Sequence, residues 1–345
     1  MTERIGITTT VPIEVIFAAG KVPVDLNNIF ITSDDPASCV QFAEYNGYPR
    51  NVCGWIKGIY ATALTCGINK IIAAVEGDCS QTQAMMETLE MQGLEVIPFA
   101  FPYGRDRDML RLQIEKLMER LGADWDSVNL WKKRLDEIRA LAWRLDEMTW
   151  RENKVLGSEN HHYQICCSDF NGNPDKYAKE LQIFLDKAEG RAKCFTLRQA
   201  QDAIIDTRDG GVRIGYVGIP PIFTDFYEFL ESLNVNVVFN EVQRQFTMPF
   251  ETDDLIEQYA LYTYPYDIFA RIEDIKREIE RRGIHGLIHY TQSFCFRQIQ
   301  DMILRKMVDL PILTIEGENP TRLDGRTKVR IESFLEMLER QCKTG

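Results

Sequence analysis

The chain has 345 residues, of which 45% are hydrophobic and 27% are charged. This composition is ordinary for a globular protein of about two domains, and it argues against the disordered, collagenous and disulfide-scaffold classes. The formal net charge of −12 repels phosphate backbones, and no run of about 18 apolar residues indicates a membrane span, so neither nucleic acid nor a membrane is expected as a partner. The N-terminal residues lack the apolar core of a signal peptide, which favours a cytoplasmic protein.

Residues 1–105 alternate between strand and helix patterns, and we expect them to form an N-terminal α/β domain. A helix is predicted over residues 51–66, because apolar side chains recur there at three- and four-residue spacing and Gly67 can end the helix. Strands are expected at residues 4–10, 28–32, 70–76 and 94–99. The run at 70–76 is apolar throughout, which is typical of a strand that is covered on both faces.

Residues 106–160 have a different pattern, which predicts a helical connector beside the first sheet. They are rich in charge, and Leu110, Ile114 and Leu117 begin an apolar stripe at helical spacing. Residues 161–345 return to alternating patterns and are expected to form a C-terminal α/β domain. Strands are expected there at residues 212–217, 235–240, 284–290 and 312–316. Repeated β–α–β units of this length predict two mostly parallel sheets with helices on both faces.

Cysteine is the most informative residue type in this sequence. The chain has nine cysteines and no C-x-x-C pair, so any metal site must combine ligands that are far apart along the chain. Cys79 and Cys295 each follow a predicted strand, and Cys53 lies in the first turn of a predicted helix. Because the carboxyl ends of parallel strands meet at one edge, these three thiols can converge on an iron–sulfur cluster. The alternative is that they are buried structural thiols.

Other candidate residues lie near the middle of the chain. Cys166 and Cys167 are adjacent, and neighbours in a strand point to opposite faces, so both can reach one cluster only if the backbone bends. Cys194 is a further candidate ligand. His161, with Glu159 nearby, is a candidate acid or base, although a polar cap at the domain junction explains the same residues equally well.

Several catalytic motifs are absent from the sequence. It contains no G-x-x-x-x-G-K-[ST], no G-x-G-x-x-G, no G-x-S-x-G and no H-E-x-x-H. We therefore do not expect this chain to hydrolyse ATP through a P-loop, and a dinucleotide-binding fingerprint is not supported.

The three cysteines stand in segments that form a recognisable set. These segments are 51–58 (NVCGWIKG), 77–82 (GDCSQT) and 292–299 (QSFCFRQI). Together with 156–161 (LGSENH), 168–172 (SDFNG) and 315–326 (IEGENPTRLDGR), they resemble the 2-hydroxyacyl-CoA dehydratase and benzoyl-CoA reductase family over almost the whole chain.

This resemblance implies two flavodoxin-like or Rossmann-like α/β domains with helical elements. It further implies that Cys53, Cys79 and Cys295 hold a 4Fe–4S cluster in the cleft between them. Electrons would come from a separate dimeric ATPase that carries its own iron–sulfur cluster, which agrees with the missing P-loop. A homodimer is expected, because the relatives work as pairs of similar subunits.

Two branches of the family lead to different functions. Dehydratases act on acyl-CoA thioesters, in which one electron makes a ketyl radical anion before the 2-hydroxyl group leaves. Double-cubane proteins are homodimers that reduce small molecules at an [8Fe–9S] cluster, which needs six cysteines. The surplus of cysteines here favours the double-cubane branch, with Cys166, Cys167 and either Cys194 or Cys66 as the additional ligands. A non-catalytic cluster-binding protein and a metal-free α/β binding protein are the competing classes.

Overall fold

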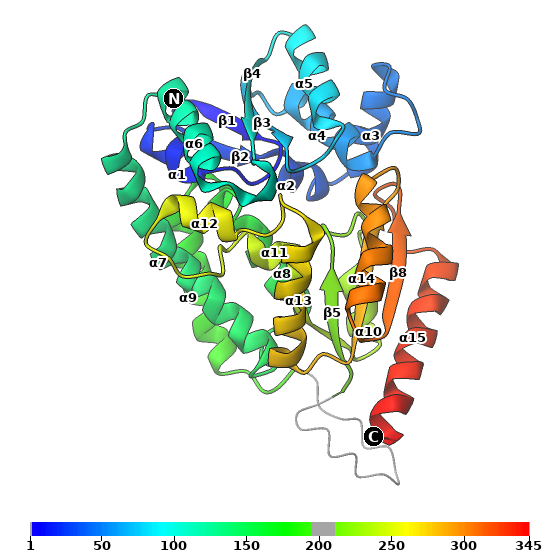
Figure 1. Ribbon diagram of the computed structural model, residues 1–345. Coiled ribbons are helices and arrows are strands. Elements are labelled where there is room, and N and C mark those ends of the chain that lie inside the picture. The colour runs from blue at the N-terminus through cyan, green and yellow to red at the C-terminus, as the bar shows by residue number, and fades with distance from the viewer. Residues whose placement is uncertain (1, 195–210, 345) are drawn as a thin grey trace.

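A computed structural model describes residues 2–194 and 211–344 of the chain, with side chains described as far as Cys342. The described residues form two four-stranded sheets in which every strand pairs in parallel, with helices packed around both sheets (Figure 1). This arrangement confirms the expected α/β class and is consistent with two flavodoxin-like domains. Within the described residues, no helix is both long enough and apolar enough to cross a membrane.

The first sheet has the strand order β2-β1-β3-β4. Its strands are β1 (Arg4–Ile7), β2 (Val22–Asp25), β3 (Lys70–Glu76) and β4 (Glu95–Ala100). The strand expected at residues 28–32 was wrong, because this segment belongs to helix α2 (Leu26–Ile31) and the strand lies just before it. Asp25 starts the helix, since its carboxylate accepts a hydrogen bond from the backbone N–H of Asn27 at 2.8 Å.

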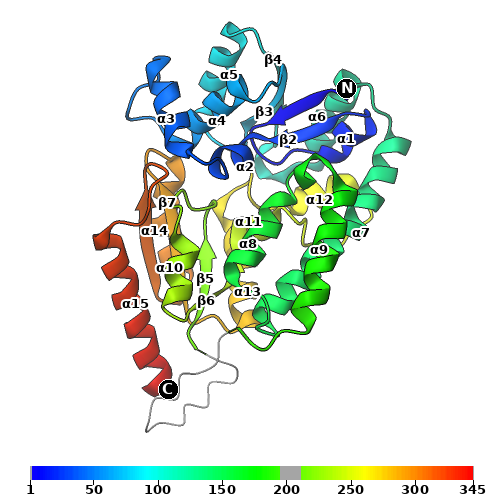
Figure 2. The ribbon, with the colours of Figure 1, turned by 180° about the vertical axis from the view of Figure 1, so that it is seen from behind.

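The second sheet repeats the topology of the first. Its strands are β5 (Arg213–Val217), β6 (Asn236–Asn240), β7 (Gly286–Gln292) and β8 (Ile312–Gly317), in the order β6-β5-β7-β8. In each sheet the first strand of the half lies between the second and the third. In open parallel sheets with this order, ligands bind beyond the carboxyl ends of the strands, where the strand order reverses. The two sheets lie one above the other in the views from the front and from behind (Figures 1 and 2).

The helices of the first half are α1 (Ile13–Ala18), α2, α3 (Pro36–Tyr45), α4 (Gly54–Thr65) and α5 (Thr82–Met91), followed by the short 3-10 turn η1 (Tyr103–Arg105). Those of the second half are α10 (Phe226–Ser232), α11 (Glu241–Gln245), α12 (Leu255–Leu261), α13 (Ile268–Arg282), η3 (Phe296–Gln300), α14 (Asp301–Met307) and α15 (Gly325–Thr344).

The helical segment between the two sheets is longer than the sequence indicated. It consists of α6 (Arg107–Leu121), α7 (Trp125–Trp150), α8 (Gly157–Cys166), the turn η2 (Phe170–Gly172) and α9 (Pro174–Glu189). The expected boundary between residues 160 and 161 falls inside α8. Cys166 therefore ends a helix and does not lie in a strand, which corrects the strand geometry assumed for the Cys166–Cys167 pair. The division into three domains stays a prediction.

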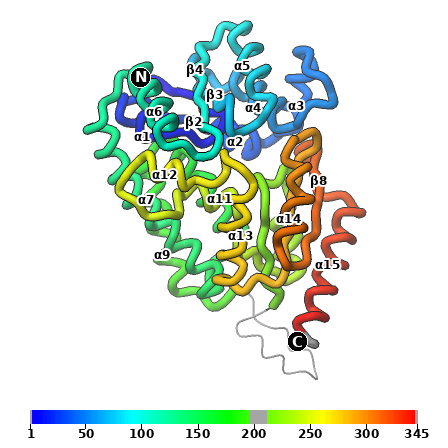
Figure 3. The backbone as a smooth tube through the Cα atoms, viewed as in Figure 1, coloured from blue at the N-terminus to red at the C-terminus, as the bar shows by residue number. Residues whose placement is uncertain are grey.

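The two halves share their hydrophobic cores. One buried cluster joins Ile5 of β1 and Leu145 of α7 to Tyr259 of α12, and a second joins Ile71 of β3 to Ile288 of β7. Helix α12 accordingly packs against α6, which the backbone trace also shows (Figure 3). Because apolar side chains from both halves are buried together, the edges of the two sheets are held in a fixed relation.

Candidate functional site

A cavity of about 90 Å³ lies where the two sheets face each other. Segments that follow the strands line it: residues 8–10 after β1, residues 78–79 after β3, residues 219–220 after β5 and residues 295–297 after β7. We call this the main cavity. It lies at the place that the strand order of both sheets predicts for a ligand. Cys53, Cys79 and Cys295 all line it, so the fold brings together the three thiols that the sequence singled out.

The three cysteines share one local arrangement, since each lies at or just before the start of a helix or helical turn. Cys53 is the N-cap residue of α4, Cys295 is the N-cap residue of η3, and Cys79 lies just before α5. The sulfur of each accepts a hydrogen bond from the backbone N–H two residues further along, with Gln81 N 3.4 Å from Cys79 Sγ. Backbone N–H groups at the start of a helix stabilise negative charge. Each thiol therefore lies where the backbone favours its thiolate form.

Burial acts against this effect in the protein without a bound cation. It raises the pKa of Cys53 to about 11, and the N–H groups of Trp55 and Ile56 offset only part of the rise. Burial also raises the pKa of Cys79, which the charges of Asp78, Cys53 and Cys295 raise further. Three neighbouring thiolates in one buried cavity repel each other, and a bound metal centre is the usual compensation.

The donor set fits a cluster better than a single metal ion. Among the described residues, no three His, Cys, Asp or Glu side chains are grouped as ligands of one ion. An iron–sulfur cluster makes a different demand, because each thiolate binds a different iron atom and the sulfurs stand further apart. Three thiols around one cavity, each at the amino end of a helix or helical turn, meet that demand.

Gly54 holds the end of α4 directly against the second half of the chain. A Cβ atom on Gly54 would lie 2.5 Å from the backbone oxygen of Glu318, which is too close for any side chain. The same oxygen accepts a hydrogen bond from Gln292 Nε2 at 2.9 Å. Glycine after Cys53 therefore lets the loop that follows β8 approach the helix and fixes the cysteine over the main cavity.

The comparison with protein families agrees with this geometry. The family described as 2-hydroxyglutaryl-CoA dehydratase, D-component, matches residues 8–338. The chain belongs to this family. Membership of the D-component family shows a 2-hydroxyacyl-CoA dehydratase-like component with an enzyme-like role, and it confirms the resemblance noted in the sequence. A search of curated proteins finds no match.

The other candidate cysteines of this D-component family member do not line the main cavity. Cys166 is the last residue of α8 and Cys167 is its C-cap, with the Cys167 sulfur 3.2 Å from the Tyr177 hydroxyl. The backbone N–H of Cys194 donates to the oxygen of Asn153. Cys66 caps the far end of α4, about 20 Å along the helix from Cys53. Their assignment as ligands stays a prediction.

The candidate acid–base pair also lies outside the main cavity. Glu159 accepts a hydrogen bond from the backbone N–H of Leu156 at the start of α8 and pairs with Arg191 at 2.8 Å. His161 Nδ1 lies 3.0 Å from the Tyr227 hydroxyl, and burial lowers the pKa of His161 to about 3. These contacts are typical of a helix cap and a buried packing contact. The catalytic assignment of both residues stays a prediction.

Sequence reasoning missed the carboxyl groups that do line the main cavity. Asp25 and Asp78 both line the cavity. Asp169 contacts Asp25, because its carboxylate accepts a hydrogen bond from the backbone N–H of Asp25 at 2.7 Å. Burial raises the pKa of all three, to about 6 for Asp78. Tyr264 donates a hydrogen bond to Asp78 at 3.0 Å. The signal was available, since Asp25 ends β2 and Asp78 lies two residues after the end of β3.

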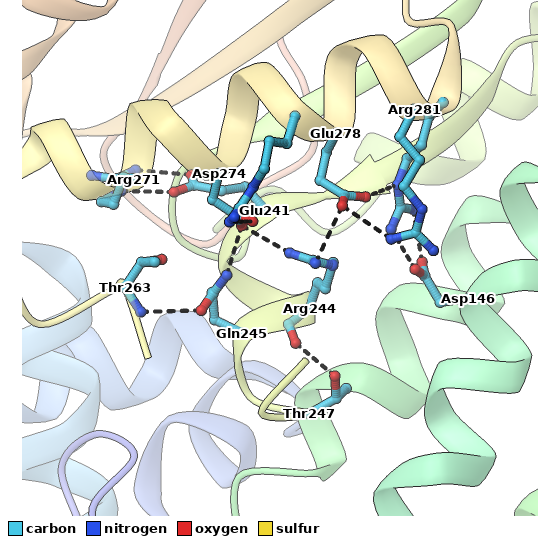
Figure 4. A network of polar contacts seen from close by, with 12 residues as sticks. Asp146, Glu241, Arg244, Gln245, Thr247, Thr263, Arg271, Asp274, Glu278 and Arg281 are labelled. Carbon is cyan, nitrogen blue, oxygen red and sulfur yellow. Dashed lines mark hydrogen bonds and ion pairs between the residues drawn. The ribbon is translucent and has the colours of Figure 1, made fainter. Parts of the chain in front are cut away.

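Buried acids elsewhere in the molecule have a different environment. Glu14 pairs with Arg139 at 2.8 Å, Glu241 pairs with Arg271 at 2.7 Å, and their pKa values are lowered. Figure 4 shows the larger network around α13, in which Arg244 contacts both Asp274 and Glu278. Within the described residues, Asp25, Asp78 and Asp169 form no ion pair with Lys or Arg. Buried carboxyls without a cation partner are typical of functional sites.

Proposed function

We propose that this chain is the cluster-bearing component of an enzyme that dehydrates 2-hydroxyacyl-CoA thioesters, with one 4Fe–4S cluster held by Cys53, Cys79 and Cys295. The observation that carries the proposal is the main cavity, to which three thiols come from three separate helix or turn starts. When bound, the cluster would supply one electron at low potential to the substrate. Among the described residues, no fourth thiol lines the cavity, which would leave one corner of such a cluster free of protein thiolates.

The chain's own side chains would supply the rest of the chemistry. Trp55, Ile56 and Ile59 form an apolar wall that excludes water from the cavity. Asp25 and Asp78 place carboxyl groups in the lining of the same cavity as the thiols, where they can hydrogen-bond and orient the substrate hydroxyl group. The backbone N–H groups that point at the sulfurs would tune the reduction potential.

A separate ATP-hydrolysing activator is part of this proposal, because the chain has no P-loop. We further propose a dimer. The direct test combines the anaerobically purified protein, the activator with ATP, and 2-hydroxyglutaryl-CoA as the first probe. Formation of the enoyl-CoA that depends on ATP would support the proposal. A protein that contains a cluster and takes up electrons, but leaves every 2-hydroxyacyl-CoA unchanged, would overturn it.

The double-cubane reductase is the second candidate, and the adjacent buried cysteines favour it. Cys166 directly follows Ile165, which lines the main cavity, so a second cubane would need α8 to unwind at its end. Iron analysis separates the two candidates. About four irons per chain would support the dehydratase-type cluster, and about eight would establish the double cubane. A cluster with neither activity would return the chain to the class of non-catalytic cluster carriers.

A further inference from the structure

A second, smaller cavity adjoins the main cavity on the side of β7. Its volume is about 20 Å³, which is room for about one water molecule. The two cavities share part of their lining, including Cys295, Arg297 and Gln292. The small cavity has one lining residue of a kind that the main cavity lacks, the histidine at position 289. An imidazole therefore lines a water-sized space that shares Cys295, Arg297 and Gln292 with the proposed reaction site.

The hydrogen bonds around His289 fix the state of its ring. His289 lies on β7 and is buried, and its Nδ1 atom is 2.6 Å from Oδ1 of Asp301. Asp301 accepts further hydrogen bonds from Thr314 Oγ1 at 2.6 Å and from Arg305 Nε at 2.7 Å. A carboxylate that accepts three donors is ionised, so Nδ1 must donate to it. The neutral ring then presents Nε2 as a proton acceptor.

The hydrogen bonds around Asp301 keep this carboxylate ionised. Burial by itself would raise the pKa of Asp301, but the hydrogen bonds from His289, Thr314 and Arg305 lower it below its ordinary value. Asp301 therefore stays negative and holds the His289 ring through Nδ1, as the carboxylate does in an Asp–His pair of a hydrolase.

Other charged groups face His289 from the neighbouring elements. Glu241 of α11 is close enough for His289 to lower its pKa, and Arg271 of α13 neutralises Glu241 at 2.7 Å. Arg305 neutralises part of Asp301, and Arg297 of η3 lines the small cavity. Arg297 donates to the backbone oxygens of Gly77 and Tyr264, and Asp301 is the acid in direct contact with the ring.

We infer that His289, oriented by Asp301, is the acid–base group of this site and exchanges a proton with the main cavity through one water molecule in the small cavity. The inference rests on the proposed dehydration. In that reaction, the substrate loses a C3 proton and a C2 hydroxide. The proton passes through the water to Nε2, the imidazolium returns it to the departing hydroxide, and one water molecule is formed with no net change at His289.

His161 and Glu159 do not have these features. Neither lines a described cavity, and the nearest hydroxyl to His161 belongs to Tyr227, whose proton goes to Asn240 Oδ1 at 2.8 Å. His289 shows the two properties of a proton carrier, an ionised partner on one nitrogen and a water-sized space beside the ring.

The first test is independent of turnover. The chain has four histidines, so nitrogen NMR of the ¹⁵N-histidine-labelled protein resolves each ring, and His289→Asn identifies the His289 signals. We expect the neutral ring in the Nδ1–H form, and Asp301→Asn, whose amide can also donate, should weaken the preference for that tautomer. An Nε2–H form in the wild-type protein, or a tautomer preference that Asp301→Asn leaves unchanged, would overturn the inference.

The second test uses the cluster-loaded protein with its activator and 2-hydroxyglutaryl-CoA. His289→Asn keeps a donor for Asp301 and should retain iron content and thioester affinity, while turnover falls about 100-fold. Added imidazole should restore part of the turnover. The matched control is His285→Asn, because the His285 ring accepts the backbone N–H of Arg213 and lines neither cavity.

The two proposals fail in different ways. Loss of the proposed dehydration would appear as wild-type protein that does not turn over, whatever the tautomer of His289. If the wild-type protein turns over and His289→Asn stays within about twofold of it with the same pH profile, the role of His289 is contradicted while the dehydratase remains.

Discussion

The three cysteines of the main cavity and the Cys166–Cys167 pair lie at opposite ends of their helices. The first group is at amino ends, where free N–H groups point at the sulfurs. The pair is at the carboxyl end of α8, where the backbone presents oxygens. Burial raises the pKa of Cys166 to about 12, and the nearby charges of Asp169 and Asp25 raise it further.

This difference shows that burial alone does not identify a metal ligand. Cys53 and Cys167 are both buried, yet one faces a cavity with N–H groups behind it and the other packs in the core beside Tyr177. A thiolate is the form that binds iron, so the end of the helix and the access to a cavity decide which thiols can serve.

Gly54→Ala is expected to have the largest effect on stability and iron binding, because Gly54 directly follows one of the cavity cysteines. The added methyl group would clash with the Glu318 backbone oxygen at 2.5 Å, so the start of α4 and Cys53 must move. We expect a destabilisation of about 1–3 kcal/mol and a several-fold loss of bound iron. Thermal unfolding and iron analysis measure the two effects. Gly190→Ala is the control, since a Cβ atom added there would have its nearest neighbouring atom at 3.8 Å. Equal loss of iron in both variants would contradict this account.

The pH dependence of cluster assembly should follow the cavity thiols. Their pKa values are raised above the ordinary value, so they are protonated at pH 7 and iron must displace the protons. Reconstitution should therefore weaken as the pH falls, by up to about tenfold per pH unit for each thiol that loses a proton on binding iron. Iron uptake by the metal-free protein between pH 6 and 9 gives this slope. A flat profile would mean that the thiols are already ionised.

A smaller effect on stability is expected from a substitution beside the Cys166–Cys167 pair. Tyr177→Phe removes the hydroxyl that lies 3.2 Å from the Cys167 sulfur and donates to the Tyr163 oxygen at 2.8 Å. We expect the free energy of unfolding to fall by about 1 kcal/mol with unchanged iron content. Denaturant unfolding and iron analysis of the same preparation test this. A clear loss of iron would place the pair at a cluster.

The smallest effect is expected for His161→Gln. The wild-type ring contacts the Tyr227 hydroxyl, and its loss should lower stability by less than about 1.5 kcal/mol. Turnover should stay the same, because the residue lines neither cavity. Steady-state kinetics measures this, and a strong loss of turnover with intact stability would restore the catalytic assignment made from the sequence.

The sequence contained enough information for the fold class and for the three cavity thiols. Alternating patterns predicted the parallel sheets, and the position after a strand or at a helix start marked Cys53, Cys79 and Cys295. The shift between β2 and α2 was missed because a four-residue strand next to a six-residue helix gives almost no periodic signal.

The choice among the histidines could not be made from the sequence. His161 stands in a polar segment, which favours an acid–base role, while His289 stands in a predicted strand that is mostly apolar. Only the tertiary structure brings Asp301 to the Nδ1 atom of His289, brings Thr314 to Asp301, and forms the small cavity beside the ring. The same holds for Asp25 and Asp169, which are 144 residues apart and meet only through packing.

The central claim is that Cys53, Cys79 and Cys295 hold a single cluster, and iron with acid-labile sulfide per chain tests it most directly. Wild-type protein and two serine variants, Cys79→Ser and the double variant Cys166→Ser/Cys167→Ser, would be purified without oxygen. We predict about four irons in the wild type, the same number in the double variant and almost none in Cys79→Ser. About eight irons in the wild type that fall in the double variant, or full iron content in Cys79→Ser, would contradict the account.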